Sequence, residues 1–135
     1  MSIGRLLLVE DEPSLAQLLV RFLSRAGYDV VACASAAEAQ AGWDDAFDIA
    51  VVDLGLPDMP GERLAAELLA RSERITIVVS SGTPTEAASL GFPDEAISQG
   101  RVHVLQKPYF PGHLIELLSG IPRRGSDGLD GGDAG

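Results

Sequence analysis

The sequence predicts an α/β domain in which five parallel strands form one sheet and helices cover both of its faces. Short apolar runs alternate along the chain with helix-forming segments, a pattern typical of strand–helix–strand units with right-handed crossovers. The runs are continuously apolar, as expected of parallel strands that are buried on both faces. Polar residues directly follow four of these runs, which predicts a ligand site at the carboxyl edge of the sheet.

The predicted strands and helices follow one another without interruption. Strands are expected at about 5–10, 29–33, 48–53, 75–80 and 102–106. Helices are expected at about 13–26, 35–42, 61–71, within 84–99 and at 111–119. Each of the first four helices then connects one strand to the next.

The first predicted helix has the clearest pattern. Pro13 suits its first turn, where no backbone donor is needed, and Gly27 suits the position after its end. Its apolar residues fall at helical spacing: Leu15, Leu18, Leu19, Phe22 and Leu23. We expect this stripe to pack into the core rather than to form a binding groove.

Capping boxes predict where the second and fourth helices begin. In this motif a Ser or Thr and an acidic residue three positions later satisfy free backbone amides of the first turn. Ser35 with Glu38 and Thr83 with Glu86 match it, so we expect helices to start at 35 and 83. Because Pro93 removes a backbone donor and disfavours helix in the residue before it, we expect the fourth helix to be short or broken.

Composition and charge restrict the class of protein. The 135 residues are 46% hydrophobic, and we expect one domain at 1–120 followed by a disordered Gly- and Asp-rich tail at 121–135. The net charge of −10 argues against direct nucleic-acid binding, which needs a basic surface. No apolar run approaches the ~20 residues of a membrane span, so we expect no membrane insertion and a cytoplasmic protein. Cys33 is the only cysteine, which excludes an internal disulfide.

Residues at the strand ends have the chemistry of a metal and phosphoryl site. Glu10 and Asp11 follow the first apolar run, Asp53 ends the third strand, Ser81 follows the fourth run and Lys107 follows the fifth. Carboxylates brought together in this way repel one another and raise at least one pKa unless a cation is present. Mg²⁺ prefers oxygen ligands and commonly binds one or two carboxylates together with a phosphate. The pattern therefore indicates a site for a divalent cation and a phosphoryl group.

Four motifs in this order resemble those of the receiver domain of two-component response regulators. They are Val9-Glu10-Asp11-Glu12, Val51-Val52-Asp53-Leu54-Gly55-Leu56-Pro57-Asp58-Met59-Pro60-Gly61, Ser81-Gly82 and Lys107-Pro108. The resemblance covers residues 4–119 and implies a flavodoxin-like fold with strand order 2-1-3-4-5. Each motif is short, but each also lies at the end of a predicted strand.

The resemblance implies an acceptor and a set of metal ligands. Asp53 would be the phosphoacceptor, which attacks the phosphoryl group of a phosphohistidine to give a mixed anhydride. Asp11 would bind Mg²⁺ directly and Glu10 would hold the ion mainly through water. Asp53 and the backbone carbonyl of Gly55 would complete the protein ligands.

The resemblance also implies the groups that act on the phosphoryl oxygens. Lys107 would pair with one of them and offset carboxylate charge. Ser81 would donate its hydroxyl to the phosphoryl group and move towards it, which is the family's switch. Ser80 is the alternative, and Ser81 is favoured because Gly82 follows it. The peptide bond before Pro108 would be cis.

The function implied is that of a single-domain response regulator rather than an enzyme that turns over a substrate. It would take a phosphoryl group from a sensor histidine kinase or a histidine phosphotransfer protein and signal through a downstream protein partner. A homodimer through the fourth and fifth elements is one form of such output. The alternatives are a receiver module of a hybrid histidine kinase and a degenerate receiver used as a constitutive interaction module.

Two features depart from the family pattern. Receivers usually carry Tyr or Phe three residues before the lysine, and Val104 stands there. Signalling would then rely on backbone shifts of the fourth and fifth elements or on a neighbour such as Tyr109. The span from Ser81 to Lys107 also looks a few residues longer than usual, which predicts a reshaped output face.

Other classes with related chemistry fit less well. A phosphatase of the haloacid dehalogenase class expects a second aspartate two residues after its nucleophile, and Gly55 stands there. A flavin or nucleotide binder needs a glycine-rich turn to hold phosphate. The first turn instead carries Glu10, Asp11 and Glu12, which repel phosphate in the absence of a metal. Taken alone, these acidic residues also fit a solvated loop or the charges of a helix N-terminus.

Overall fold

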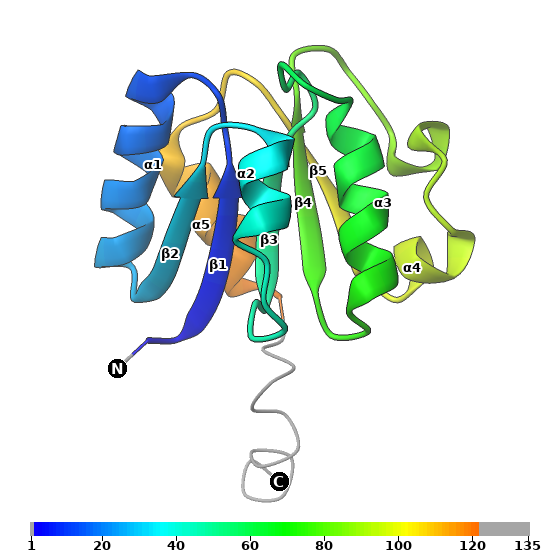
Figure 1. Ribbon diagram of the computed structural model, residues 1–135, viewed down its shortest axis with the longest axis horizontal. Coiled ribbons are helices and arrows are strands. Elements are labelled where there is room, and N and C mark those ends of the chain that lie inside the picture. The colour runs from blue at the N-terminus through cyan, green and yellow to red at the C-terminus, as the bar shows by residue number, and fades with distance from the viewer. Residues whose placement is uncertain (1, 122–135) are drawn as a thin grey trace, which may run out of the picture.

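The computed structural model describes residues 2–121, which form a central sheet with helices on both of its faces (Figure 1). All five strands are parallel and lie in the order β2-β1-β3-β4-β5. They are β1 (Gly4–Val9), β2 (Tyr28–Cys33), β3 (Ile49–Asp53), β4 (Thr76–Ser81) and β5 (Val102–Gln106). The predicted fold class and strand order are confirmed. The predicted tail, apart from its first residue, lies outside the described residues.

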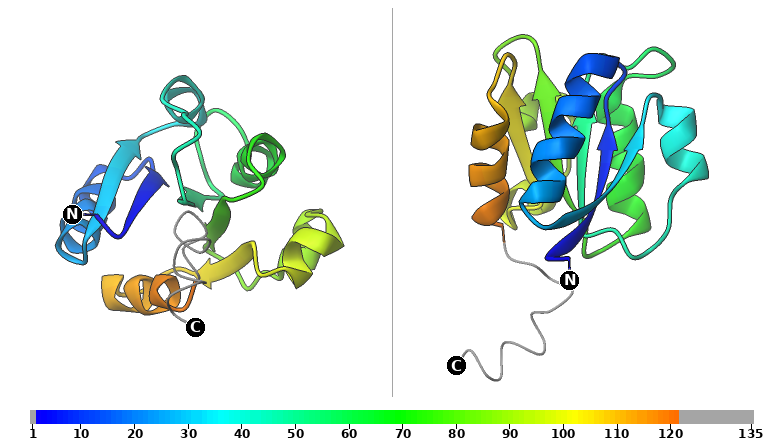
Figure 2. Two further views of the ribbon diagram at one scale, coloured as in Figure 1. Left: turned by 90° about the horizontal axis from the view of Figure 1, so that it is seen from below. Right: turned by 90° about the vertical axis from the view of Figure 1, so that its left-hand side faces the viewer.

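The helices divide between the two faces of the sheet. Figure 2 shows α1 and α5 on one face and α2 and α3 on the other. The helices are α1 (Pro13–Arg25), α2 (Ala36–Ala41), α3 (Gly61–Arg71), α4 (Asp94–Ser98) and α5 (Pro111–Ser119), with a 3₁₀ turn, η1, at Ala87–Leu90. Within residues 2–121, none of these helices combines the length and the apolarity needed to cross a membrane.

Two apolar cores, one on each face of the sheet, follow from the alternation of side chains along the strands. In β1, Leu6 and Leu8 pack with residues of α1 and α5, whereas Leu7 and Val9 pack with residues of α2 and α3. All four are at most 1% exposed. The alternation also fixes the side of the sheet on which a residue just beyond a strand end lies.

The first helix agrees with the prediction at its ends and only partly along its apolar stripe. Pro13 is its first residue, and Gly27 follows its cap with φ of 108°, a conformation that favours glycine. Leu19 is buried, but Leu18 and Phe22 are 39% and 37% exposed. The prediction that the whole stripe is core is wrong for these two residues, because they form a separate i, i+4 row beside the buried one.

The region of the predicted fourth helix needs one correction. Ser35 caps α2 as predicted, since its side chain accepts from the Glu38 amide. No helix starts at Thr83. Its carbonyl accepts a hydrogen bond from the Ser81 hydroxyl, and the first helical turn after β4 is η1. Gly91 then adopts φ of 83° and ends that turn. The prediction of a short or broken helix is confirmed, with five residues left in α4.

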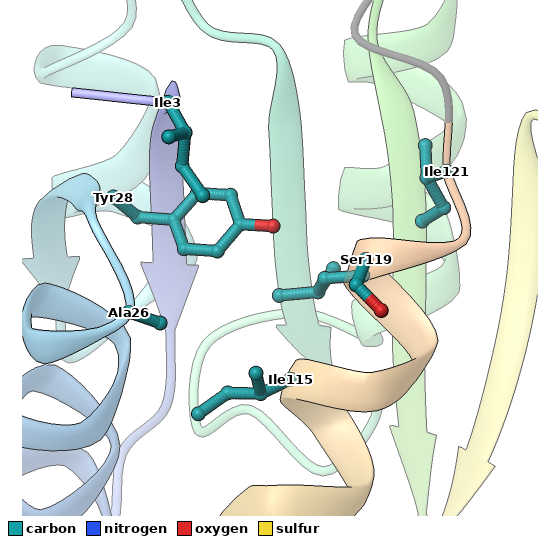
Figure 3. A pocket seen from close by; sticks show the side chains of 7 residues that line it. Ile3, Ala26, Tyr28, Ile115, Ser119 and Ile121 are labelled. Atoms are coloured by element: carbon teal, nitrogen blue, oxygen red, sulfur yellow. The ribbon is translucent and has the colours of Figure 1, made fainter.

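A partly open cavity of about 360 Å³ lies between the end of α1 and the end of α5 (Figure 3). The residues that line it are Ile3, Ala26, Tyr28, Ile115, Leu118, Ser119 and Ile121. Ile3 precedes β1 and Tyr28 begins β2, so the cavity is at the amino edge of the sheet. The polar strand-end residues lie at the opposite edge.

Gly61 lets α3 begin directly beside the end of β3. Its amide donates to the Leu54 carbonyl at 3.0 Å. A Cβ atom at this position would lie 2.6 Å from the Leu54 Cα and closer still to the Asp53 carbonyl oxygen. These neighbours are backbone atoms that cannot rotate away. Glycine is therefore required for the close approach of the two segments.

We expect Gly61→Ala to lower the free energy of unfolding by about 1–3 kcal/mol, the usual cost of overpacking. Gly112→Ala is the matched control, because a Cβ atom there meets nothing within 4 Å and alanine is the better helix former. The control should unfold at the same urea concentration as the parent or at a slightly higher one. Equal urea midpoints for Gly61→Ala and the parent would contradict this account of the packing.

Candidate functional site

Three carboxylates meet at the carboxyl edge of the sheet. Glu10 and Asp11 follow β1, and Asp53 ends β3, the neighbour of β1. Each offers one oxygen, and these oxygens lie within 4.8 Å of one another. Glu10 is 3% and Asp53 8% exposed, whereas Asp11 is open to solvent. A set of oxygen donors with one open side suits a hard divalent cation such as Mg²⁺.

Lys107 brings a positive charge to these carboxylates from the end of β5. Its Nζ donates to Glu10 Oε1 at 3.0 Å and forms an ion pair with Asp53 Oδ1 at 3.4 Å. Two positions before each of these charged residues lies an apolar one. Leu8 and Val51 belong to the core beneath α1 and α5, and Leu105 packs against it. Strand alternation therefore brings the three charged groups to the same side of the sheet. The peptide bond before Pro108 is cis, as predicted.

Negative charge exceeds positive charge in this cluster. Burial is the main cause that raises the pKa of Glu10, and the charge of Asp53 also raises it. The hydrogen bonds from the Glu12 amide and from Lys107 act to lower this pKa but do not outweigh burial. Burial acts to lower the pKa of Lys107, but its contacts with Glu10 and Asp53 outweigh burial and raise that pKa overall. Lys107 therefore stays protonated while it faces more than one carboxylate. A divalent cation would offset the remaining charge.

Gly55 lies in the loop after β3, close to the Asp53 side chain. Its amide donates to Asp53 Oδ1 at 3.1 Å, a local turn in which an aspartate accepts from the backbone two residues later. A Cβ atom at Gly55 would lie 3.8 Å from that oxygen, which is an ordinary contact. Packing thus does not demand glycine here. The role of its carbonyl as a metal ligand stays a prediction.

Ser81 ends β4, but its hydroxyl points to the loop that follows. Among the described residues its partners are Thr83 and Thr85: the Ser81 Oγ lies 2.8 Å from the Thr83 carbonyl oxygen and 2.9 Å from Thr85 Oγ1. Thr85 Oγ1 lies 2.9 Å from the same carbonyl oxygen. Ser80, the alternative, is the register partner of Asp53 in β3. The structure therefore brings Glu10, Asp11, Asp53 and Lys107 together and leaves the Ser81 hydroxyl bonded to its own loop.

Asp58 ties the loop after β3 to α2, a role that the sequence analysis missed. Its carboxylate accepts from the Ala36 and Ala37 amides, each at 2.9 Å. Ser35 accepts from the Glu38 amide at 3.2 Å, so the amides of the first turn of α2 are each bonded to a side chain. The bonds from Ala36 and Ala37 lower the pKa of Asp58. One indication of this role is present in the sequence: the first amides of a predicted helix need hydrogen-bond acceptors.

We expect Asp58→Ala to be less stable than the parent near neutral pH. A carboxyl whose pKa is lowered on folding stabilises the protein above its unfolded pKa of about 3.9, and this contribution is lost as pH falls through the folded value. The difference in urea midpoint between variant and parent should therefore shrink below about pH 4. Asp45→Ala, at an exposed position, is the control. A difference that does not change with pH would contradict the capping role.

Comparison with known proteins gives one family. The family model described as "Response regulator receiver domain" matches residues 6–119. The "Sensory transduction protein RegX3" of Mycolicibacterium smegmatis is 32% identical over 127 residues, which cover 93% of this chain and 54% of that protein. The "Regulatory protein VanRB" of Enterococcus faecalis is 31% identical over 121 residues, which cover 89% of this chain and 53% of that protein. The chain thus spans about half the length of the curated relatives it matches.

Solved structures agree with this match. A CheY-like response regulator receiver domain protein from Methanospirillum hungatei has a TM-score of 0.73 and 25% identity, with 87% of this chain and 92% of that chain covered. The non-phosphorylated HemR receiver domain from Leptospira biflexa has a TM-score of 0.75 and 25% identity, with 89% and 97% covered.

Proposed function

The chain belongs to the response regulator receiver domain family, and from this premise we propose that it accepts a phosphoryl group on Asp53. The donor is the phosphohistidine of a sensor histidine kinase or of a histidine phosphotransfer protein. The observation that carries the proposal is the convergence of Glu10, Asp11 and Asp53 with Lys107 at one edge of the sheet.

Asp53 is the nucleophile in this proposal. A carboxylate oxygen of Asp53 attacks phosphorus, the bond between phosphorus and the histidine nitrogen breaks, and the imidazole keeps the electron pair of that bond. The product is an aspartyl phosphate, a mixed anhydride. The Gly55 amide and Lys107 hold Asp53 Oδ1, so the carboxylate is oriented before the donor arrives, which lowers the entropic cost of the transfer.

Mg²⁺ is the proposed cofactor, and the donor set described above fits it. Asp11, exposed at the edge of the cluster, would bind it directly, Glu10 would hold it mainly through water, and Asp53 and the Gly55 carbonyl would complete the protein ligands. When bound, the ion neutralises charge on the phosphoryl oxygens. Lys107, which contacts Asp53 Oδ1, would add a second cationic group beside the phosphoryl oxygens.

Output passes through protein contacts in this proposal. Ser81 leaves Thr83 and Thr85, donates to the phosphoryl group, and so changes the loop between β4 and η1. A downstream protein partner reads this change, and a homodimer through the fourth and fifth elements is one form of the response. The chain is a phosphoacceptor that catalyses its own phosphorylation and slow dephosphorylation, rather than a turnover enzyme. We propose no contact with nucleic acid for a chain of net charge −10.

Acetyl phosphate, a small phosphoryl donor, tests the proposal without knowledge of the natural kinase. We expect a gain of one phosphoryl group in the intact mass of the chain, and we expect this gain to require Mg²⁺. The Asp53→Asn variant should show no gain, because the amide is not a nucleophile of this kind.

The other outcomes have distinct meanings. A gain that persists in Asp53→Asn would assign the acceptor role to another residue. No gain in the parent under any condition would favour the degenerate receiver that acts as a constitutive interaction module. A gain of mass in both the presence and the absence of Mg²⁺ would remove the metal from the proposal.

Ser81→Ala should separate phosphorylation from the response to it. We expect this variant to gain the phosphoryl group on Asp53 but to lose most of the change in amide hydrogen exchange over residues 82–90. Ser89→Ala is the control, because the Ser89 hydroxyl is exposed and bonds only locally, to the Glu86 carbonyl. A full exchange response in Ser81→Ala would show that the switch hydroxyl belongs to another residue, with Ser80 as the next candidate.

A further inference from the structure

The hydroxyl of Tyr109 is buried without a hydrogen-bond partner. Within residues 2–121 it is the one buried side-chain polar atom of which this is true. A buried hydroxyl that bonds to nothing costs about 1–3 kcal/mol. Phenylalanine would fill the same space without this cost, so packing alone does not explain a tyrosine at this position.

Tyr109 lies on the same side of the sheet as the buried carboxylates. It follows Lys107 by two residues and packs against the core beneath α1 and α5, the side on which strand alternation places Glu10 and Asp53. Burial, and then the charges of Glu10 and Asp53, raise the pKa of Tyr109. The phenol therefore keeps its proton at neutral pH and presents a donor to a negatively charged environment.

Glu10 has the capacity to accept a further hydrogen bond. Its Oε1 accepts from Lys107 at 3.0 Å and its Oε2 from the Glu12 amide at 3.1 Å. An ionised carboxylate accepts about four hydrogen bonds, so lone pairs remain on Glu10. No direct bond joins Tyr109 to Glu10 in the described part of the chain. A bridging water would satisfy the phenol and the carboxylate together, and such waters generally cost little free energy.

We propose that Tyr109 is a positioning residue for the metal site: its hydroxyl donates through one water to Glu10 and fixes the orientation in which this carboxylate faces Mg²⁺. The inference rests on the proposed function, because it concerns the same site. Groups that orient metal ligands in this way typically change metal affinity 10–100-fold when they are removed. Because a water intervenes here, we expect an effect of about tenfold, at the lower end of that range.

Tyr109→Phe tests the inference, because it removes the hydroxyl and keeps the ring. Mg²⁺ alone is titrated into the parent, Tyr109→Phe, Glu10→Gln and the double variant, and binding is followed by NMR amide shifts. We expect Tyr109→Phe to weaken binding about tenfold in the parent background and to have little further effect when Glu10 is already glutamine. Tyr28→Phe is the matched control: it removes the other tyrosine of the chain, at the opposite edge of the sheet (Figure 3), and should bind as the parent does.

Each result decides between a positioning role and a structural one. Unchanged affinity in Tyr109→Phe would overturn the inference and leave the proposed function intact. Equal losses from Tyr109→Phe in the parent and in the Glu10→Gln background would show that the hydroxyl does not act through Glu10. A parent chain that binds no Mg²⁺ would overturn the proposed metal site and the inference with it. The amide spectra also show whether each variant is folded.

Discussion

The carboxyl edge of the sheet depends on the ammonium of Lys107. Glu10 and Asp53 are both nearly buried, and removing a carboxylate from water costs several kcal/mol unless a partner compensates. Lys107 contacts both, although β4 separates its strand from β3. One group thus joins the ends of β1, β3 and β5. Buried ion pairs of this kind are often no more stabilising than apolar residues of the same volume, so the cluster is better explained by chemistry than by stability.

The loop after β3 is held at both ends, and this limits how far the Asp53 carboxylate can move. Gly61 packs against the backbone at the end of β3, and Asp58 bonds to the first amides of α2. Gly55, near the start of this loop, bonds directly to the Asp53 side chain. A reacting group held in one orientation needs less ordering when its partner arrives. The short, tightly bonded loop therefore serves the chemistry proposed for Asp53 as much as it serves the fold.

Sequence patterns predicted the fold because burial and periodicity are local properties. The first strand was expected at about 5–10 and lies at Gly4–Val9, and parallel strands bring their carboxyl ends to one edge wherever the helices lie. Asp58 could not be found in this way, because the helix it caps begins 22 residues earlier. Thr83 shows the opposite error. It has the sequence of a capping box, but its carbonyl bonds to Ser81, two residues earlier, so another local hydrogen bond formed in place of the cap.

The bonds of Ser81 suit the proposed switch, in which no aromatic residue stands at the position of Val104. Val104 packs against the core beside α2 and α3. The Ser81 hydroxyl, the Thr85 hydroxyl and the Thr83 carbonyl make three short oxygen contacts with two protons between them. One of the three contacts therefore has no proton at any moment. When Ser81 leaves the Thr83 carbonyl, the Thr85 hydroxyl can donate its proton to that carbonyl. Turning Ser81 towards a phosphoryl group on Asp53 therefore leaves no carbonyl without a donor. In the proposed switch, the bonds that change belong to the loop between β4 and η1, and the switch would not need a large side chain to move into the core.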